Sequence, residues 1–268
     1  MTVPEPPWPW TVHADPAALG AELAAAIVMR YLEARTAERP FLLGCPGGRT
    51  PRPIYAEMAR LGGVLDVDWS GLHIVMMDDY LVRDGDRMVA CPADAHFSCR
   101  RFAELEIVGL LDEGRAPARR VGRLMMPDPQ APADYDQAID RLGGIDVFIV
   151  ASGASDGHVA FNPPGTAADS TTRIVPLAET TRRDNLKTFP RFGSIDEVPT
   201  HGLTVGLATI AAAREVMMVL HGVEKGLSLR RLLDAEDFDP AWPATILHRC
   251  GGATLHVDRA AWTAADRV

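Results

Sequence analysis

Short apolar runs alternate with longer amphipathic segments along most of the chain. Four of these runs carry almost no polar residue inside them, which predicts strands buried on both faces: Phe41–Leu43, Leu72–Met77, Ile145–Val150 and Glu215–Leu220. The segments between them repeat apolar side chains at helical spacing, as in residues 17–35, 95–111, 133–142 and 223–233. Strands that alternate with helices are typical of a parallel sheet covered on both faces. The pattern therefore predicts an α/β fold, a Rossmann-like three-layer sandwich with a mostly parallel sheet.

The ends of the chain add detail to this picture. Four prolines before Trp10 exclude regular helix, so residues 1–12 are expected to form an extended arm. Asp15-Pro16 then supplies an N-cap and a first-turn proline for the helix over residues 17–35. No internal repeat or low-complexity linker interrupts the alternation, so we expect one domain over residues 1–268.

Composition narrows the classes of partner. The 268 residues are 47% hydrophobic and 24% charged with a net charge of −9, and no dense basic run is present, which argues against nucleic acid. The four cysteines form no C-x-x-C pair, the N-terminus has no signal-peptide core, and no apolar run reaches membrane-spanning length. A cytoplasmic protein without a membrane partner, and without a metal site, is the expectation.

The first candidate for chemistry is the stretch Ile145–Pro164. Its apolar run breaks into small residues and then delivers Asp156, Gly157 and His158 together. Open α/β sheets bind ligands just past the carboxyl ends of their strands, and a neighbouring carboxylate can orient a proton-transferring imidazole. The alternative is a loop in which Asp156 and His158 only satisfy backbone groups.

A second candidate follows the strand at residues 41–43. The segment GCPGGRTP is a glycine-rich turn that leads into a helix, and glycines 44, 47 and 48 allow backbone amides to approach an anion. The segment is not a P-loop, because it lacks the lysine of that signature and its spacing is different. It does not match the dinucleotide-binding fingerprint either. The segment predicts a generic anion-binding loop, with a tight strand-to-helix turn as the alternative.

A third candidate is Asp78-Asp79 at the end of the strand over residues 72–77. Side chains alternate in extended backbone, so one carboxylate can face a ligand while the other makes a structural bond. A carboxylate at the mouth of an apolar strand can have its pKa raised by burial to a value useful for a general base. Three such sites at three strand ends together indicate acid/base chemistry on a small phosphorylated substrate.

Five segments, in order along the chain, carry a family resemblance: LGCPGGRTP, VMMDDYL, SGASDGHVAFNPP, LTVGLATI and GVEKGLSL. They resemble the glucosamine-6-phosphate deaminase (isomerase) family and its relative, 6-phosphogluconolactonase. The resemblance implies the deaminase/phosphogluconolactonase type of fold. It also implies an aldose–ketose isomerisation of an amino-sugar 6-phosphate with loss of the amine as ammonia. No metal or organic cofactor is implied, and a homo-oligomer is one assembly that fits.

The resemblance also implies roles for individual residues. Asp78 matches the base that moves the proton at sugar C2, and His158, oriented by Asp156, matches the group that assists ring opening. The substrate's phosphate would be bound by the following residues: Gly47, Gly48, Arg49, Thr50, Lys225 and Arg191. Tyr80 is expected only to pack.

The sequence also departs from the family. The deaminases have a glutamate five residues after the histidine, where this chain has Pro163, so a third triad member is missing unless Glu179 or Asp169 reaches in. Family members also usually have threonine and glycine where this chain has Gly47 and Arg49. Two alternatives therefore stay open: a 6-phosphogluconolactonase-type hydrolase, in which the histidine activates water, and a non-catalytic regulator that binds a sugar phosphate. Phe161-Asn162 and Tyr80 favour the deaminase branch.

Overall fold

The computed structural model describes residues 5–267, and its centre is a seven-stranded parallel sheet. In spatial order the strands are β1 (Trp10–His13), β11 (Ala253–Asp258), β10 (Glu215–Leu220), β7 (Val147–Ala151), β2 (Phe41–Cys45), β3 (Leu72–Met76) and β6 (Arg123–Met125). The four strands expected from the apolar runs are all present, and they occupy the middle of the sheet. Strand order reverses between β2 and β7, which is where open parallel sheets form ligand-binding crevices.

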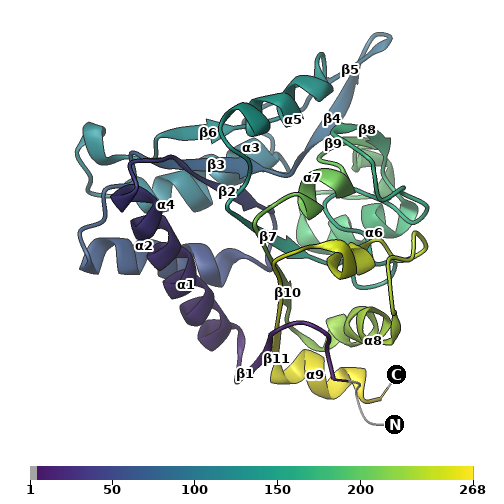
Figure 1. Ribbon diagram of the computed structural model, residues 1–268. Coiled ribbons are helices and arrows are strands. Elements are labelled where there is room, and N and C mark those ends of the chain that lie inside the picture. Colours follow the sequence, from purple (N-terminus) through teal and green to yellow (C-terminus); the bar gives the residue numbers. More distant parts are fainter. Residues whose placement is uncertain (1–4, 268) are drawn as a thin grey trace.

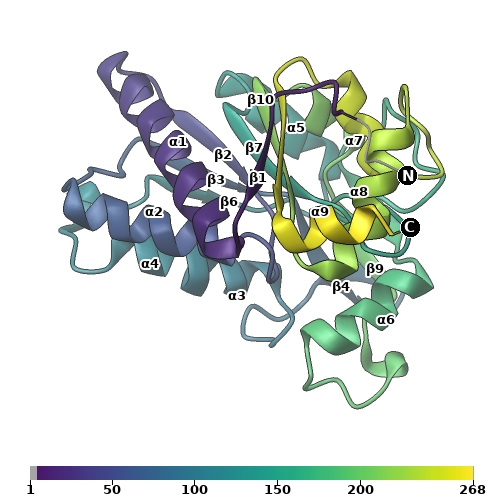
Figure 2. The ribbon, with the colours of Figure 1, turned by 90° about the horizontal axis from the view of Figure 1, so that it is seen from below.

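Helices cover both faces of this sheet, as Figures 1 and 2 show. One face carries α1 (Pro16–Thr36), α2 (Arg52–Val64), α3 (Cys99–Ala103) and α4 (Gly109–Asp112), with a π-helical turn at Glu104–Val108. The other carries α5 (Pro132–Arg141), α7 (Leu207–Ala211), α8 (Gly226–Asp234) and α9 (Arg259–Ala265). Short 3₁₀ segments lie at Pro117–Arg119, Ile195–Glu197, Val223–Lys225 and Pro243–Arg249. The expected three-layer α/β sandwich is confirmed.

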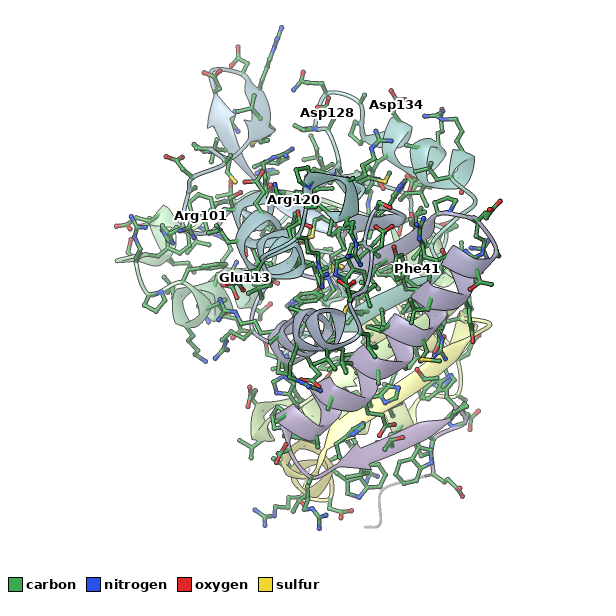
Figure 3. The ribbon with its side chains drawn as sticks, turned by 90° about the vertical axis from the view of Figure 1, so that its left-hand side faces the viewer. Phe41, Arg101, Glu113, Arg120, Asp128 and Asp134 are labelled. Carbon is green, nitrogen blue, oxygen red and sulfur yellow. The ribbon has the colours of Figure 1, made fainter. Side chains whose placement is uncertain are left out.

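Strand β2 illustrates why its residues are apolar on both faces. Phe41 and Leu43 point into the core beneath α1, whereas Leu42 points into the core on the opposite side. Figure 3 shows Phe41 beside α1, where its ring meets the ring of Tyr31 edge-on with centroids 5.9 Å apart. Burying each such side chain contributes about 1.5–3 kcal/mol, which is why the strand reads as an unbroken hydrophobic run.

A second sheet was not predicted. It is antiparallel, with the strand order β5 (Arg87–Ala90), β4 (Asp78–Asp84), β9 (His201–Thr204) and β8 (Arg173–Pro176). Figure 1 shows β4, β8 and β9 gathered beside α6 (Glu179–Thr188), to one side of the parallel sheet. The segment Arg83–Asp86 therefore ends β4 and turns into β5. After Met77 the backbone leaves one sheet for the other, so Asp78 begins a strand.

Two boundaries also need correction. The arm expected over residues 1–12 is extended from Trp10 onward, but it is not free there, because Trp10–His13 pair in parallel with β11 as an edge strand; residues 1–4 lie outside the described residues. The helix expected from residue 95 begins at Cys99, because the Ser98 side chain caps it by accepting from the Arg101 amide at 3.2 Å. The cap predicted for the first helix is confirmed: Asp15 accepts from the Ala18 amide at 2.8 Å, and Pro16 is the first helical residue.

All four cysteines are free and buried. Over residues 5–267, none of the helices combines the length and the hydrophobicity needed to cross a bilayer.

Candidate active site

A cavity of about 550 Å³ opens where strands β2, β7 and β10 end and where β4 begins. Residues from three of the predicted sites line it together: the loop Gly47–Thr50, Asp78 and His158. Lys225, from the 3₁₀ turn after β10, lines the same cavity. Segments separated by more than a hundred residues thus meet at the carboxyl ends of the strands.

The glycine-rich loop joins β2 to α2 and forms one wall of this cavity. Gly48 has φ +85°, a conformation that a side chain would strain, so the tight turn requires glycine here. The His221 Nε2 lies 3.1 Å from the Thr50 carbonyl oxygen and ties the loop to the end of β10. The amides of this loop and the first turn of α2 make this wall suited to an anion.

The two adjacent carboxylates behave differently, as the alternation of side chains predicts. Asp79 accepts from the Cys99 amide at 2.9 Å and from its neighbour's amide at 2.8 Å, so its role is structural. Asp78 lines the cavity and accepts from the Cys99 thiol at 3.4 Å. Burial is the largest effect on Asp78 and raises its pKa to about 7. The hydrogen bond from the Cys99 thiol lowers this pKa, and the charge of Asp79 raises it further. A carboxyl with that pKa can both take and return a proton near neutral pH.

Asp156 and His158, in the segment that follows β7, form a hydrogen-bonded pair. The His158 Nδ1 lies 2.7 Å from Asp156 Oδ1, and only the imidazole borders the cavity. Burial alone would raise the pKa of Asp156, but hydrogen bonds from His158 and Thr180 hold it well below its usual value. Gly153 makes the pair possible, because a Cβ there would lie 2.3 Å from His158 Nδ1. Asp156 therefore stays ionised and fixes the imidazole, so its other nitrogen is left for chemistry.

Helix α6 supplies contacts to this pair that the sequence analysis missed. The Thr180 hydroxyl donates to Asp156 Oδ2, and the Thr181 Oγ1 lies 3.2 Å from His158 Nδ1. Glu179 and Asp169 were considered as replacements for the missing glutamate. Neither lines the cavity, and the Glu179 carboxylate accepts from Arg183 instead of contacting His158. Threonine hydroxyls on adjacent residues at the start of a helix carry no sequence signal for such a role.

Lys225 is held in place by its own hydrogen bond. Its Nζ donates to the Ser152 carbonyl oxygen at 2.7 Å, next to the Asp-Gly-His segment. Burial lowers the pKa of Lys225, while the charge of Glu224 raises it. A half-buried ammonium with spare donors beside the glycine-rich loop fits an anionic ligand.

Arg191 lies elsewhere. It is exposed and lines an adjoining cavity of about 210 Å³, which shares Gly47, Gly48 and Arg49 with the larger one. The structure thus brings Arg49 to both cavities but does not place Arg191 on the same wall as Lys225. Tyr80 packs against Phe161 with ring centroids 4.8 Å apart, and it also lines the larger cavity, which the sequence did not predict.

Comparisons with known proteins identify the family. The family model for glucosamine-6-phosphate isomerases/6-phosphogluconolactonase matches residues 14–256. The chain belongs to this family. A glucosamine-6-phosphate deaminase of Beutenbergia cavernae is 37% identical over 254 residues, covering 92% of this chain and 88% of the relative. Glucosamine-6-phosphate deaminase 1 of Bacillus subtilis is 31% identical, covering 82% and 86%.

Solved structures of family members share the fold. A monomeric glucosamine-6-phosphate deaminase superimposes with a TM-score of 0.78 at 25% identity, over 96% of this chain and 99% of the other. A 6-phosphogluconolactonase from Trypanosoma cruzi gives a TM-score of 0.69 at 18% identity, over 97% of each chain, which supports the fold alone. The predicted family and fold type are confirmed.

Proposed function

We propose that the protein is an aldose–ketose isomerase/deaminase that acts on an amino-sugar 6-phosphate such as glucosamine 6-phosphate. The observation that carries this proposal is the placement of Asp78, a buried carboxyl with a pKa of about 7, on the same cavity as His158 of the Asp156–His158 pair. The match to curated deaminases over most of the chain supports the same activity.

The phosphate end of the substrate belongs at the glycine-rich loop. Gly47, Gly48, Thr50 and Lys225 all line the cavity, and their amides, hydroxyl and ammonium are donors that suit a phosphate. Arg49 adds a guanidinium to the same lining, where it can pair with a phosphate oxygen. Fixing the phosphate there holds the rest of a six-carbon sugar across the cavity toward Asp78 and His158.

Proton transfer at C2 falls to Asp78. With the ring open, the carboxylate takes the C2 proton, the electron pair forms the C1–C2 double bond, and the C1 oxygen takes a proton from water to give an enolamine. Returning the proton to C1 gives an imine at C2; water then adds to that carbon and ammonia leaves, so the products are a ketose 6-phosphate and ammonia. Water supplies the new carbonyl oxygen, and no electron acceptor is needed.

Ring opening falls to His158. Asp156 holds its Nδ1, so the imidazole can exchange a proton with the ring oxygen or the C1 hydroxyl. Where other deaminases use a glutamate, this chain has Pro163, and Thr181 is the group that contacts the imidazole instead. In this proposal the Thr181 hydroxyl takes over the orienting part of that role but not its charge.

A substrate panel tests the proposal. Purified protein is incubated with glucosamine 6-phosphate and galactosamine 6-phosphate, and ammonia and ketose phosphate are both measured. Formation of both in equal amounts is the expected result. Ketose without ammonia from a non-amino aldose phosphate would reduce the proposal to plain isomerisation.

The panel separates the two alternatives when 6-phosphogluconolactone is added to it. Consumption of 6-phosphogluconolactone above its spontaneous hydrolysis, with no ammonia from amino sugars, would favour a lactonase. A sugar phosphate that raises the melting temperature without any turnover would favour a non-catalytic binding protein.

A further inference from the structure

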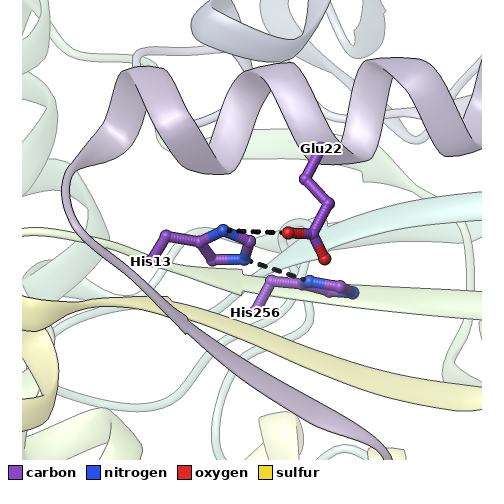
Figure 4. Close-up of side chains that lie close together, drawn as sticks. All are labelled: His13, Glu22 and His256. Carbon is purple, nitrogen blue, oxygen red and sulfur yellow. Dashed lines mark hydrogen bonds and ion pairs between the residues drawn. The ribbon is translucent and has the colours of Figure 1, made fainter.

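A cluster of possible metal ligands lies at the edge of the parallel sheet, away from the sugar-phosphate cavity. It consists of His13 on β1, His256 on β11 and Glu22 on α1, and Figure 4 shows the three side chains facing one another. One ligand atom from each residue can be chosen so that all three atoms lie within 4.8 Å of one another. None of the three lines either cavity described above.

The register of the sheet brings the two histidines together. Strands β1 and β11 are parallel, and Thr11 lies opposite His256. Because side chains alternate along a strand, His13 shares a face with Thr11, and so it reaches the same face as His256. Helix α1 packs over this face and contributes Glu22 from its second turn.

The distances suit a shared ion. His13 Nε2 and His256 Nδ1 are 3.3 Å apart, and two nitrogens bound to one tetrahedral zinc ion at their usual bond lengths are separated by about 3.3–3.4 Å. The carboxylate of Glu22 lies 3.6 Å from His13 Nδ1, which is too long for a hydrogen bond. Its side chain is 55% exposed, so it is free to turn toward the two nitrogens.

Burial and neighbouring charges act on both imidazoles. Burial lowers the pKa of His13, although Glu22 opposes this, and burial lowers the pKa of His256 to about 4. Arg30, whose charge adds to the effect on His256, is itself paired with Glu215 at 2.9 Å.

We propose that His13, His256 and Glu22 bind a divalent transition-metal ion of the zinc class. Two imidazoles and one carboxylate form a donor set that such ions accept, and the exposed side of Glu22 leaves the fourth position to water. The ion joins β1, β11 and α1 at one point. It therefore fastens the edge strand β1 to the sheet and stabilises the folded protein without entering the sugar-phosphate cavity.

Titration of tag-free protein with zinc tests this proposal. The protein is first stripped with EDTA and dialysed, and zinc binding is followed by calorimetry and by the melting temperature. Wild type is expected to bind one equivalent and to melt at a higher temperature with zinc. Cobalt in place of zinc is expected to give the intense visible bands of a four-coordinate ion.

Three variants make the test specific. Glu22→Gln and His13→Gln are expected to weaken zinc binding at least tenfold and to remove the gain in melting temperature. His201→Gln, which changes a histidine of the second sheet, is the matched control and is expected to bind as wild type does. Because Glu22 is exposed, Glu22→Gln decides the matter even if His13→Gln fails to fold.

Two results would overturn the proposal. One is no saturable zinc binding by wild type; the other is binding that Glu22→Gln leaves unchanged. In either case the cluster is a plain contact between histidines, with His256 continuing to Thr254 at 3.1 Å.

Discussion

Hydrogen bonding is the property that separates Asp78 from Asp79. Both carboxylates are buried, but Asp79 is held by backbone amides, whereas Asp78 faces the cavity and accepts from the Cys99 thiol, a weak donor. We expect Asp78→Asn to lower kcat by about 10²–10⁴-fold, because general base catalysis contributes that much. Binding of substrate, followed by thermal shift, is expected to be retained.

Asp184 offers the matched control for that substitution. It also lines the cavity, but its side chain is 38% exposed and lies within reach of Lys187. Asp184→Asn is expected to leave kcat within about threefold of wild type, as for an exposed group that holds no reacting proton. A loss equal to that of Asp78→Asn would mean that charge in the cavity, rather than the base, controls the rate.

The raised pKa of Asp78 also predicts two pH dependences. As a base it must be ionised, so kcat is expected to rise as the pH increases through about 7. In the unfolded chain the same carboxyl has the ordinary aspartate pKa of about 3.9. Between about pH 4 and 7 the unfolded state therefore holds fewer protons, and the stability that this group contributes falls as the pH rises. Asp78→Asn is expected to flatten this part of the stability profile, and identical profiles for variant and wild type in pH-dependent denaturation would contradict the burial of this group.

Lys225 gives a prediction about the phosphate. Removing its ammonium in Lys225→Ala is expected to raise KM about 10–100-fold, since a hydrogen bond to a charged group contributes about 1.5–3 kcal/mol. Lys187→Ala removes a cation that lines the same cavity but is 78% exposed, and little change is expected. Steady-state kinetics on both variants makes the comparison, and equal KM values would remove Lys225 from the phosphate site.

At the scale of elements, the starts of β2, β7 and β10 are joined by one buried carboxylate. Asp146 accepts from the Leu42 amide at 2.9 Å and from Arg39 and Arg214 at 2.6 and 2.9 Å. Asp146→Ala leaves that amide without its side-chain partner, so we expect a loss of about 1–3 kcal/mol in the free energy of unfolding. Asp140→Ala on the exposed face of α5 is the control, expected within about 0.5 kcal/mol of wild type by denaturant unfolding.

Elements that obey local rules were predictable from the sequence. The central strands are continuous apolar runs, and α1 has its cap and proline in place, so hydrophobic pattern and capping chemistry were sufficient. Strand β4 was not recognised, because its first residues, Asp78 and Asp79, are polar and follow an apolar run without a turn. Its strand character comes from pairing with β9, which lies more than a hundred residues away.

The candidate site divides in the same way. The loop, the carboxylate pair and the Asp-Gly-His segment each follow a strand, so their convergence could be expected from the rule for parallel sheets. The threonines of α6 could not, because their contacts depend on how the second sheet and α6 pack over the first. Arg191 was assigned by family resemblance, and its role remains a prediction, since its side chain lies on the adjoining cavity.

At the scale of the whole molecule, the two sheets meet around the site. The parallel sheet supplies the glycine-rich loop, the Asp-Gly-His segment and Lys225, whereas Asp78 stands at the first position of the antiparallel sheet. The proposed base thus belongs to the antiparallel sheet, whereas the proposed phosphate site belongs to the parallel sheet. Their relative position depends on Met77, where the chain passes from one sheet to the other. The Met77 amide donates to the Cys45 carbonyl oxygen at 3.1 Å, and this hydrogen bond fixes the backbone there.

The most direct measurement is turnover of glucosamine 6-phosphate by wild type and by Asp78→Asn, with ammonia and ketose phosphate quantified in the same samples. The proposal predicts equal amounts of the two products from wild type and a fall of about 10²–10⁴-fold in the variant, with binding of the sugar phosphate preserved. No ammonia from wild type, or undiminished turnover in Asp78→Asn, would contradict it.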